Sequence, residues 1–486
     1  KLKIQWNEGA TAAHGTTVFD KQAQAFSKQE PQSVVRADGD AAAALKSAAK
    51  KVEAAYQYPF LVHAQMEPCN CTSHFANGKL EIWSTSQTPQ QAQGIAQRLS
   101  GLEPANITMH MMRMGGGFGR RLANDYIAES VAIAKAVPGV PVHLRWTRED
   151  DMRWDVYNRA AGWHFLSGGL DANGALVAWR NHFVTVGTGG RPSGSANLSA
   201  NEFPARFVPN FAIVQSINES GIPTGPNRAP GSNVNAFVMQ SFLDELAHAA
   251  KMDPAAFRLK NIASLDRELA LGLTTLTYNR WKAALVDVMS RANWQAKVAN
   301  SVAQTGDVRK GRGIALGAFA GTQAAAVVDI EVSLKTGKIV AKELWVSQDN
   351  GISFYLDGGI NNSIGAAVQG VSRAIWEGLN FDTKYVTGLD WVTYPMLRFK
   401  DHPKVTTSIL QRFDVPDVTS ATLGSNGQST RNALVENVGS YAGGSGEPGL
   451  SPVAGAIGNA FFDATGVRIR RAPFSPERRC SPAAWH

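Results

Sequence analysis

Three turn signals constrain the fold of this chain most, because each separates two segments in which polar and apolar residues alternate. They are Asn77-Gly78 in CTSHFANGKLEIWSTSQ, Asn173-Gly174 in WHFLSGGLDANGALVAWRNHFVTV, and Gly337 in AAVVDIEVSLKTGKIVAKELWVS. The dipeptide Asn-Gly is typical of hairpin turns, whose central residues take positive φ. The sequence therefore predicts three β-hairpins spread along the chain.

Helical patterns lie between these hairpins. The segment NDYIAESVAIAKAVPG places Ile127, Val131 and Ala134 on one helical face. An Asp-capped helix is predicted in DGDAAAALKSAAKKVEAAYQ, and Asp253-Pro254 is predicted to start another. Together the hairpins and helices predict an α+β fold, in which mixed sheets pack against helices in two principal lobes.

A length of 486 residues is enough for roughly two to four domains. The predicted division has four parts. Residues 1–55 are the end of a small N-terminal α/β region, and residues 56–265 are a first lobe. Residues 266–312 are a helical connection that ends in the polar run QTGDVRKGRG, and residues 313–486 are a second lobe.

Charge and cysteine content exclude some functions. The net charge is +8, but the basic residues are spread along the chain without a nucleic-acid-binding module, so no nucleic-acid partner is expected. Three cysteines, Cys69, Cys71 and Cys480, are too few for the four thiolates of an iron–sulfur cluster. Metal ligation by side chains is not expected, and Cys69 and Cys71 are predicted to be core thiols.

A glycine run lies between an apolar stretch and a predicted helix in MRMGGGFGRRLANDYIAES. Its spacing fits neither common nucleotide loop, because a GxGxxG pattern that starts at Gly115 fails at Arg120. A tight turn and an anion-binding loop are both compatible with this spacing.

A lone carboxylate, Glu447, lies in GGSGEPGLSP, ahead of the helical pattern VAGAIGNAFFDATG. Ser451 is predicted to be the N-cap of this helix and Pro452 its first residue. Glu447 is then either a capping charge or a general base held at a reaction centre, since a helix N-terminus favours an ionised carboxylate.

Several motifs, taken in order, resemble those of the molybdenum hydroxylases, the family of xanthine oxidase and aldehyde oxidoreductase. They are VHAQMEPCNCT, STSQTPQ, GGGFGRR, TGPNRAPGSNVNAFVMQSFLDELAHAA, GAAVQG, and GSGEP with PVAGAIGNAFFDATG. The resemblance covers most of residues 56–475. It is greatest to the branch of the isoquinoline 1-oxidoreductase β-subunit and membrane-bound aldehyde dehydrogenase.

This resemblance implies two molybdopterin-binding lobes and a catalytic subunit that oxidises an aldehyde or N-heterocycle with water as the oxygen source. The implied cofactor is molybdopterin cytosine dinucleotide, whose metal is held by a pterin dithiolene rather than by side chains. By similarity, Glu447 is the base. Gln87 hydrogen-bonds the oxo ligand, and Arg228 orients substrate or cofactor.

The resemblance also implies a set of cofactor-binding residues, in which Phe118 and Gly119 pack beside the oxo ligand. Ordinary packing is the alternative for Phe118, and apolar helix packing is the alternative for Gln369. The predicted set is Gln87, Gly116, Gly117, Phe118, Gly119, Arg228, Gln369 and Gly446.

Three departures from the family pattern narrow the expected chemistry. Soon after the glycine loop, RRLAND replaces the acidic residue that purine-oxidising relatives have there, so purines are not expected. No cysteine occurs in TGPNRAPG, which argues against a copper-bridged site. In MRWDVYNRAAG the branch has arginine directly after tyrosine, whereas this chain has Asn158 followed by Arg159, and either residue could face the pocket.

The branch also has an EMGQG-like cofactor motif before the region seen here, and the chain has none. The expectation is that the chain is a fragment, or that a separate polypeptide supplies that half. A non-catalytic binding or assembly component is therefore the alternative function.

Electrons left by substrate oxidation need an acceptor, and the sequence contains no haem or dinucleotide motif. A small [2Fe–2S] subunit is the expected partner, with a c-type cytochrome beyond it by resemblance to the membrane-bound branch. This resemblance implies a periplasmic location or the periplasmic face of the inner membrane, with the cytoplasm as the alternative.

Overall fold

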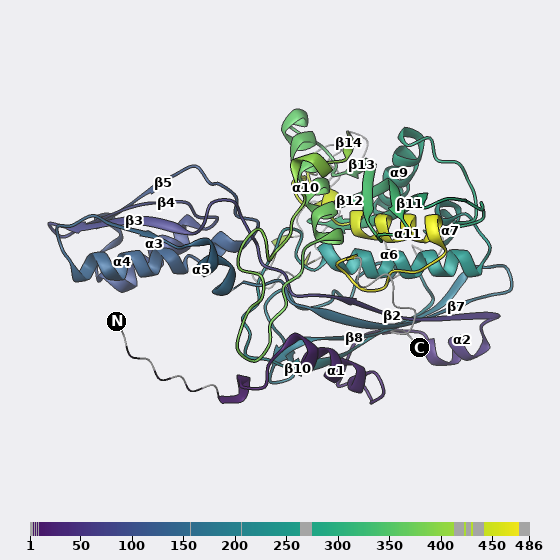
Figure 1. Cartoon of the computed structure of the whole chain (residues 1–486), viewed down its shortest axis with the longest axis horizontal. Helices are drawn as coiled ribbons and strands as arrows, with labels where there is room; N and C mark the ends of the chain where they lie inside the picture. Colours follow the sequence, from purple (N-terminus) through teal and green to yellow (C-terminus); the bar gives the residue numbers. More distant parts are fainter. Residues whose placement is uncertain are drawn as a thin grey trace.

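The computed structural model describes residues 3, 5, 7, 9–155, 157–205, 207–262, 275–412, 422, 423, 429, 430 and 442–475. Cys480 and the C-terminal part of the basic cluster lie outside the described residues. Two large sheets with helices between them form the body, and a smaller sheet with its own helices projects from one end (Figure 1).

The first large sheet has the strand order β1-β10-β8-β7-β2, with the short β9 paired to β8. Strands β2, β7 and β8 are antiparallel, whereas β10 runs parallel to β8. Helices α1 and α2 cover the outer face of this sheet (Figure 1). Its strands are β1 (Ser33–Asp38), β2 (Lys50–Tyr58), β7 (Gly162–Leu170), β8 (Leu176–Thr188), β9 (Arg191–Pro192) and β10 (Asn210–Glu219).

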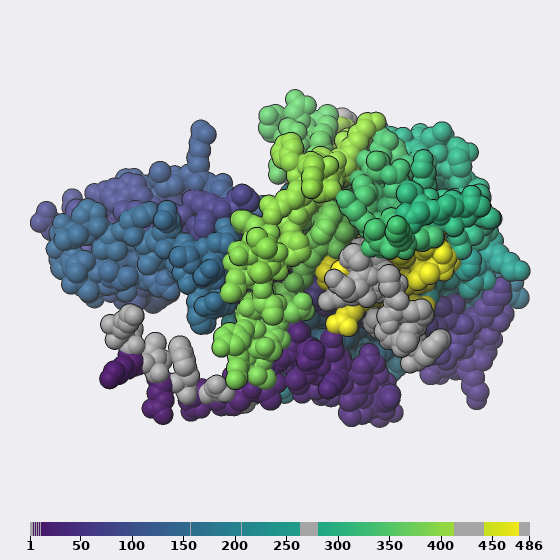
Figure 2. Space-filling view, in the orientation of Figure 1, coloured from purple at the N-terminus to yellow at the C-terminus, as the bar shows by residue number. Residues whose placement is uncertain are grey.

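The small sheet, of order β5-β4-β3-β6, carries α3 and α4. Asn77 and Gly78 join β3 to β4 with φ values of 50° and 71°, as predicted for a hairpin turn. Its elements are β3 (Asn70–Ala76), β4 (Lys79–Ser84), α3 (Pro89–Ser100), β5 (Ile107–Met111), α4 (Asp125–Ala136) and β6 (Val142–Arg145). Figure 2 shows the chain after α10 running as a ridge between this small lobe and the body.

The second large sheet has the order β11-β12-β13-β14. Helix α9 packs on one face, and α10 and α11 pack on the other. The elements are α9 (Thr275–Arg291), β11 (Val308–Phe319), β12 (Thr322–Ser333), β13 (Ile339–Asp349), α10 (Leu356–Ile375), β14 (Lys404–Leu410) and α11 (Val453–Thr465). Strand β11 begins at Val308, inside the range 266–312 that was assigned to the connection.

The main core lies between the two large sheets, where α6 (Ser232–Ala249) packs beside α11 (Figure 1). One side of α6 meets β2 and β7, and the other meets β11 and α11. Because it is enclosed on all sides, nearly all of its residues are buried, including polar ones such as Asn235 and Gln240. This helix therefore contacts both lobes, and the loop that precedes Ser232 lies between them.

The remaining elements are shorter. They are η1 (Gly9–Thr11), α1 (Thr16–Phe26), α2 (Ala41–Ser47), η2 (Pro104–Asn106), η3 (Arg120–Leu122), α5 (Arg148–Arg153), α7 (Pro254–Ile262), η4 (Phe399–Asp401), η5 (Pro448–Leu450), β15 (Thr422–Leu423) and β16 (Ser429–Thr430). None of the described helices is both long and apolar enough to cross a membrane.

Two predictions of local structure were wrong. The Asp40-capped helix ends at Ser47, and the following segment from Lys50 forms β2, because pairing with β7 outweighs the helix propensity of its alanines. Ser451 does not cap α11. It follows the 3₁₀ turn Pro448–Leu450 in helical geometry, and its hydroxyl lies 2.9 Å from that of Ser232.

Candidate active site

The glycine loop turns sharply between β5 and α4. Gly116, Phe118 and Gly119 have φ values of 102°, 54° and 112°. A Cβ on Gly119 would lie only 1.9 Å from the Pro226 carbonyl oxygen, so only glycine permits this close approach of two backbones. Helix α4 begins at Asp125, so the loop does not lead directly into its N-terminus.

Gln87 holds this loop from the strand end after β4. Its Oε1 accepts a hydrogen bond from the Gly119 N–H at 3.0 Å, and its own N–H donates to the Arg121 carbonyl. The Gln87 side-chain Nε2 has no acceptor among the described residues. Gln87 therefore brings a free amide donor to the cavity that it lines.

Arg228 connects the glycine loop to the C-terminal lobe. Its N–H donates to the Phe118 carbonyl at 2.8 Å, and its guanidinium lies over the Phe118 ring. Nε donates to the Gly446 carbonyl at 2.9 Å, and Nη1 donates to Gln369 Oε1 at 3.2 Å. Burial lowers the pKa of Arg228, and the Glu447 charge opposes that shift. Arg228 is thus an internal bridge rather than a surface ion pair.

Glu447 is anchored by the residue after Arg228. Its Oε1 accepts a hydrogen bond from the Ala229 N–H at 2.8 Å, and the side chain is partly buried. No side-chain cap is formed to η5 or to α11. The structure therefore does not support a capping role for Glu447.

A cavity of about 650 Å³ lies where these loops meet. Leu122 and Phe319 contribute apolar side chains to the cavity wall. Asn361 and Asn362, which also line the cavity, come from α10. Of the predicted residues, Gly116 and Gln369 do not line the cavity; Gly116 accepts a hydrogen bond from Arg121, and Gln369 accepts one from Arg228. Those that line it are Gln87, Gly117, Phe118, Gly119, Arg228, Gly446 and Glu447.

The sequence interpretation missed a buried cluster behind the glycine loop. His63 Nδ1 lies 2.8 Å from Asp155 Oδ2, and His63 Nε2 lies 2.8 Å from the Pro226 carbonyl. Arg120 forms a bidentate pair with Asp125 at 2.8 Å and lies 3.4 Å from Asp155. Although burial opposes it, His63 lowers the pKa of Asp155. His63 belongs to the segment VHAQMEP, whose match to the family was the only available signal.

Comparison with known proteins identifies the family. Residues 26–262 match the model of the molybdopterin cofactor-binding domain. The chain is 27% identical to a subunit of nicotinate dehydrogenase from Pseudomonas putida, across 92% of this chain and 36% of that protein. It is 23% identical to the β-subunit of isoquinoline 1-oxidoreductase from Brevundimonas diminuta, across 88% of this chain and 51% of that one. The chain belongs to the molybdenum hydroxylase large-subunit family.

A solved relative supports the fold of this hydroxylase chain. Aldehyde oxidoreductase from Desulfovibrio gigas superposes with a TM-score of 0.65 at 17% identity, over 92% of this chain and 62% of that structure. The predicted family and the predicted α+β class are both confirmed. The chain spans about a third to about half of the length of the two sequence relatives.

Neither residue of the Asn158-Arg159 pair lines the cavity that holds Glu447. Asn158 donates to the Asp155 carbonyl at 2.9 Å. Arg159 is buried over the Tyr58 ring and donates to the Pro59 carbonyl at 2.7 Å, and its burial lowers its pKa to about 10. The arginine therefore supports the fold beneath the site.

The donors at this cavity suit the family's cofactor. Among the described residues, no group of three or more histidine, cysteine, aspartate or glutamate side chains could hold a metal ion, and Cys69 and Cys71 are buried. The cavity instead offers the free Gln87 amide and the Arg228 guanidinium, beside glycines that allow close approach. Such donors fit an oxygen-rich anionic group carried by a pterin. The residues present therefore fit a molybdopterin.

Proposed function

We propose that this chain is the cofactor-binding, catalytic part of a molybdenum hydroxylase that oxidises an aldehyde or an N-heterocycle, with water as the oxygen source. One observation carries the proposal. The Glu447 carboxylate, the Gln87 amide and the glycine loop, which come from distant parts of the sequence, line one cavity. We further propose molybdopterin cytosine dinucleotide as the cofactor form.

When bound, the cofactor would supply the two-electron oxidation and hold the oxygen derived from water. Residues of this chain would hold the reacting groups in position. The Ala229 N–H fixes Glu447 Oε1, which leaves Oε2 to accept a proton. Arg228 fixes the Gly446 carbonyl next to this base, and Gln87 Nε2 donates to an oxygen in the cavity.

The cavity lining supports an aldehyde or a non-purine N-heterocycle as the substrate. Leu122, in the segment RRLAND that replaces the acidic residue of purine-oxidising relatives, places an apolar side chain in the cavity wall. The two sequence relatives are named for nicotinate and isoquinoline, and the structural relative for aldehydes.

A non-catalytic binding or assembly role is the competing proposal, favoured by the partial coverage of the relatives. Molybdenum and pterin analysis separates the two. Residues 1–486 have no EMGQG-like motif. Because a large pterin dinucleotide needs backbone donors around it to be buried and fixed, we expect these residues alone to hold it poorly. Addition of a segment with the EMGQG-like motif should bring molybdenum to about one per chain. Stoichiometric, tightly held pterin in this chain alone would show that no further segment is needed. An assembly with that segment that still binds no molybdenum would favour the non-catalytic role.

We also propose that a small [2Fe–2S] subunit accepts the electrons, with a c-type cytochrome beyond it, at the periplasmic face of the inner membrane. The given sequence has three cysteines, fewer than the four thiolates of such a cluster, which supports a cluster held outside residues 1–486. The complex purified from its native host is expected to contain iron and to show the visible absorption of an iron–sulfur protein. An active complex without iron would contradict this proposal.

A further inference from the structure

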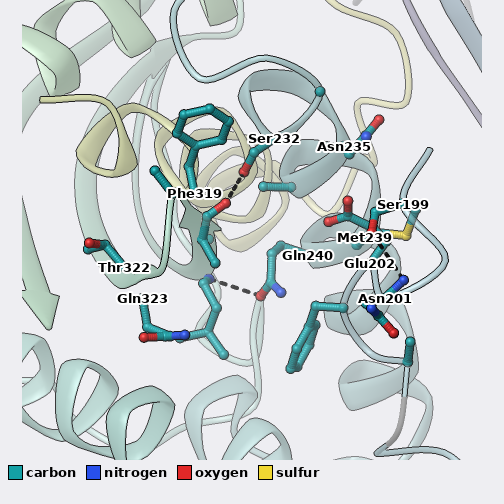
Figure 3. Close-up of a pocket in the computed structure, with 18 of the residues that line it drawn as sticks. Ser199, Asn201, Glu202, Ser232, Asn235, Met239, Gln240, Phe319, Thr322 and Gln323 are labelled. Carbon is teal, nitrogen blue, oxygen red and sulfur yellow. Dashed lines mark hydrogen bonds between the residues drawn. The ribbon is translucent and has the colours of Figure 1, made fainter. Parts of the chain in front are cut away.

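A second cavity, of about 620 Å³, lies beside the first. Pro230 and Phe319 line both cavities, so they form the wall between the Glu447 site and this neighbouring space. Figure 3 shows Phe319 at one side, with Ser232 and Gln240 of α6 near the middle. We call this space the Glu202 chamber, since Glu202 is the only ionisable side chain among its described lining residues.

One wall of the Glu202 chamber is aromatic. Phe203 lies 5.4 Å from Phe207 and 5.2 Å from Trp281, measured between ring centroids. All three line the chamber, as does Met239. Tilted aromatic groups at these distances form a well-packed apolar surface that suits a planar ring. The chamber volume lies in the range of small-molecule sites.

The Glu202 side chain is partly buried. The Asn235 side chain and the Phe203 N–H hydrogen-bond to it. Asn235 is fixed in turn by the Tyr58 hydroxyl, which donates to its Oδ1 at 3.3 Å. Figure 3 places Glu202 and Asn235 together on one side of the chamber, across from Thr322 and Gln323.

Burial raises the pKa of Glu202 to about 7, although the Asn235 and Phe203 hydrogen bonds oppose the shift. No cationic side chain lines the chamber among the described residues. The ionised carboxylate is therefore poorly compensated by the protein, and a ligand that supplied a positive charge or an N–H donor would relieve that cost.

We propose that the Glu202 chamber binds the part of an aromatic substrate remote from the reacting carbon, and that Glu202 selects substrates with a cationic nitrogen or an N–H donor there. The claim that the ligand is a substrate rests on the proposed function. The claim of binding selectivity is independent of that function. The shared Phe319 wall places such a ligand next to the cavity of Glu447.

Benzamidine and its neutral counterpart benzamide test this selectivity. Calorimetric titration of the whole chain at pH 8 is expected to show tighter binding of benzamidine. In Glu202→Gln the benzamidine affinity should fall by about tenfold or more, because a charged hydrogen bond is lost, while that of benzamide should change less than about twofold. The exposed Glu103→Gln variant is the matched control. Tryptophan fluorescence, compared with Trp281→Phe, reports whether the probe enters the chamber.

A pH series on the unmodified chain needs no variant. Benzamidine affinity should rise from pH 6 to pH 8 as Glu202 loses its proton, and benzamide affinity should stay level. Tyr58 interacts electrostatically with Glu202, and Arg159 lies over the Tyr58 ring. They keep their charge in this range, because burial raises the pKa of Tyr58 above its usual value and leaves that of Arg159 at about 10.

Equal affinity for the two probes, or unchanged benzamidine binding in Glu202→Gln, would overturn the selectivity. Neither result depends on molybdenum, so failure here leaves the hydroxylase proposal intact. Conversely, absence of molybdenum from the assembled protein would leave probe binding interpretable.

Discussion

Replacing Glu447 by glutamine is expected to lower turnover by about 100-fold or more in the molybdenum-loaded assembly. The amide keeps the size of the side chain, and its Oε1 can still accept the Ala229 N–H bond that is 2.8 Å long in the structure. It cannot accept a proton at the second position. The fold and the cofactor content should therefore be retained while the base is lost.

The measurement is turnover per bound molybdenum, with pterin content determined on the same sample. Glu149→Gln, an exposed substitution of the same kind on α5, is the control and should match the unmodified protein. A Glu447→Gln protein with full molybdenum and full activity would remove Glu447 from the reaction.

The second large effect is expected at Gly119. Alanine there would take φ near 112° and push its Cβ against the Pro226 carbonyl oxygen. Strain and overpacking together should lower the free energy of unfolding by about 2–5 kcal/mol. Because Pro226 precedes Arg228, the displaced loop should also loosen the Glu447 anchor and reduce cofactor retention.

Urea unfolding of Gly119→Ala is best compared with Gly101→Ala. Gly101 also has positive φ, at 77°, but no atom lies within 4 Å of the added Cβ. The control should lose only about 1–2 kcal/mol. Equal losses in the two variants would show that the close approach to Pro226 does not matter.

Local signals in the sequence predicted most hairpins and helices, since turn residues and apolar spacing act over short ranges. Asn77-Gly78 forms its predicted turn, and α4 buries Ile127, Val131 and Ala134 on one face as predicted. The prediction was wrong where alanine-rich sequence allowed either structure, as in β2, whose strand state depends on pairing with β7.

The order of the motifs supplied candidate site residues, and the structure brings three of them, Gln87, Arg228 and Glu447, to one cavity. Their chemical roles remain proposals. The His63–Asp155–Arg120 cluster was missed, because its members are far apart in sequence and meet only through tertiary packing. The Glu202 chamber has the same origin, since its walls come from the segment before β10, from α6, from α9 and from the β11–β12 hairpin.

The bonds from Arg228 and Ala229 to the Gly446–Glu447 segment span a sequence separation of 218 residues. Neither lobe by itself can fix the direction of the Glu447 carboxylate. The proposed base therefore acquires its geometry only when the lobes have docked. An incompletely assembled molecule would lack an oriented proton acceptor even if each lobe were intact, so chemistry at this site would be limited to the fully assembled form.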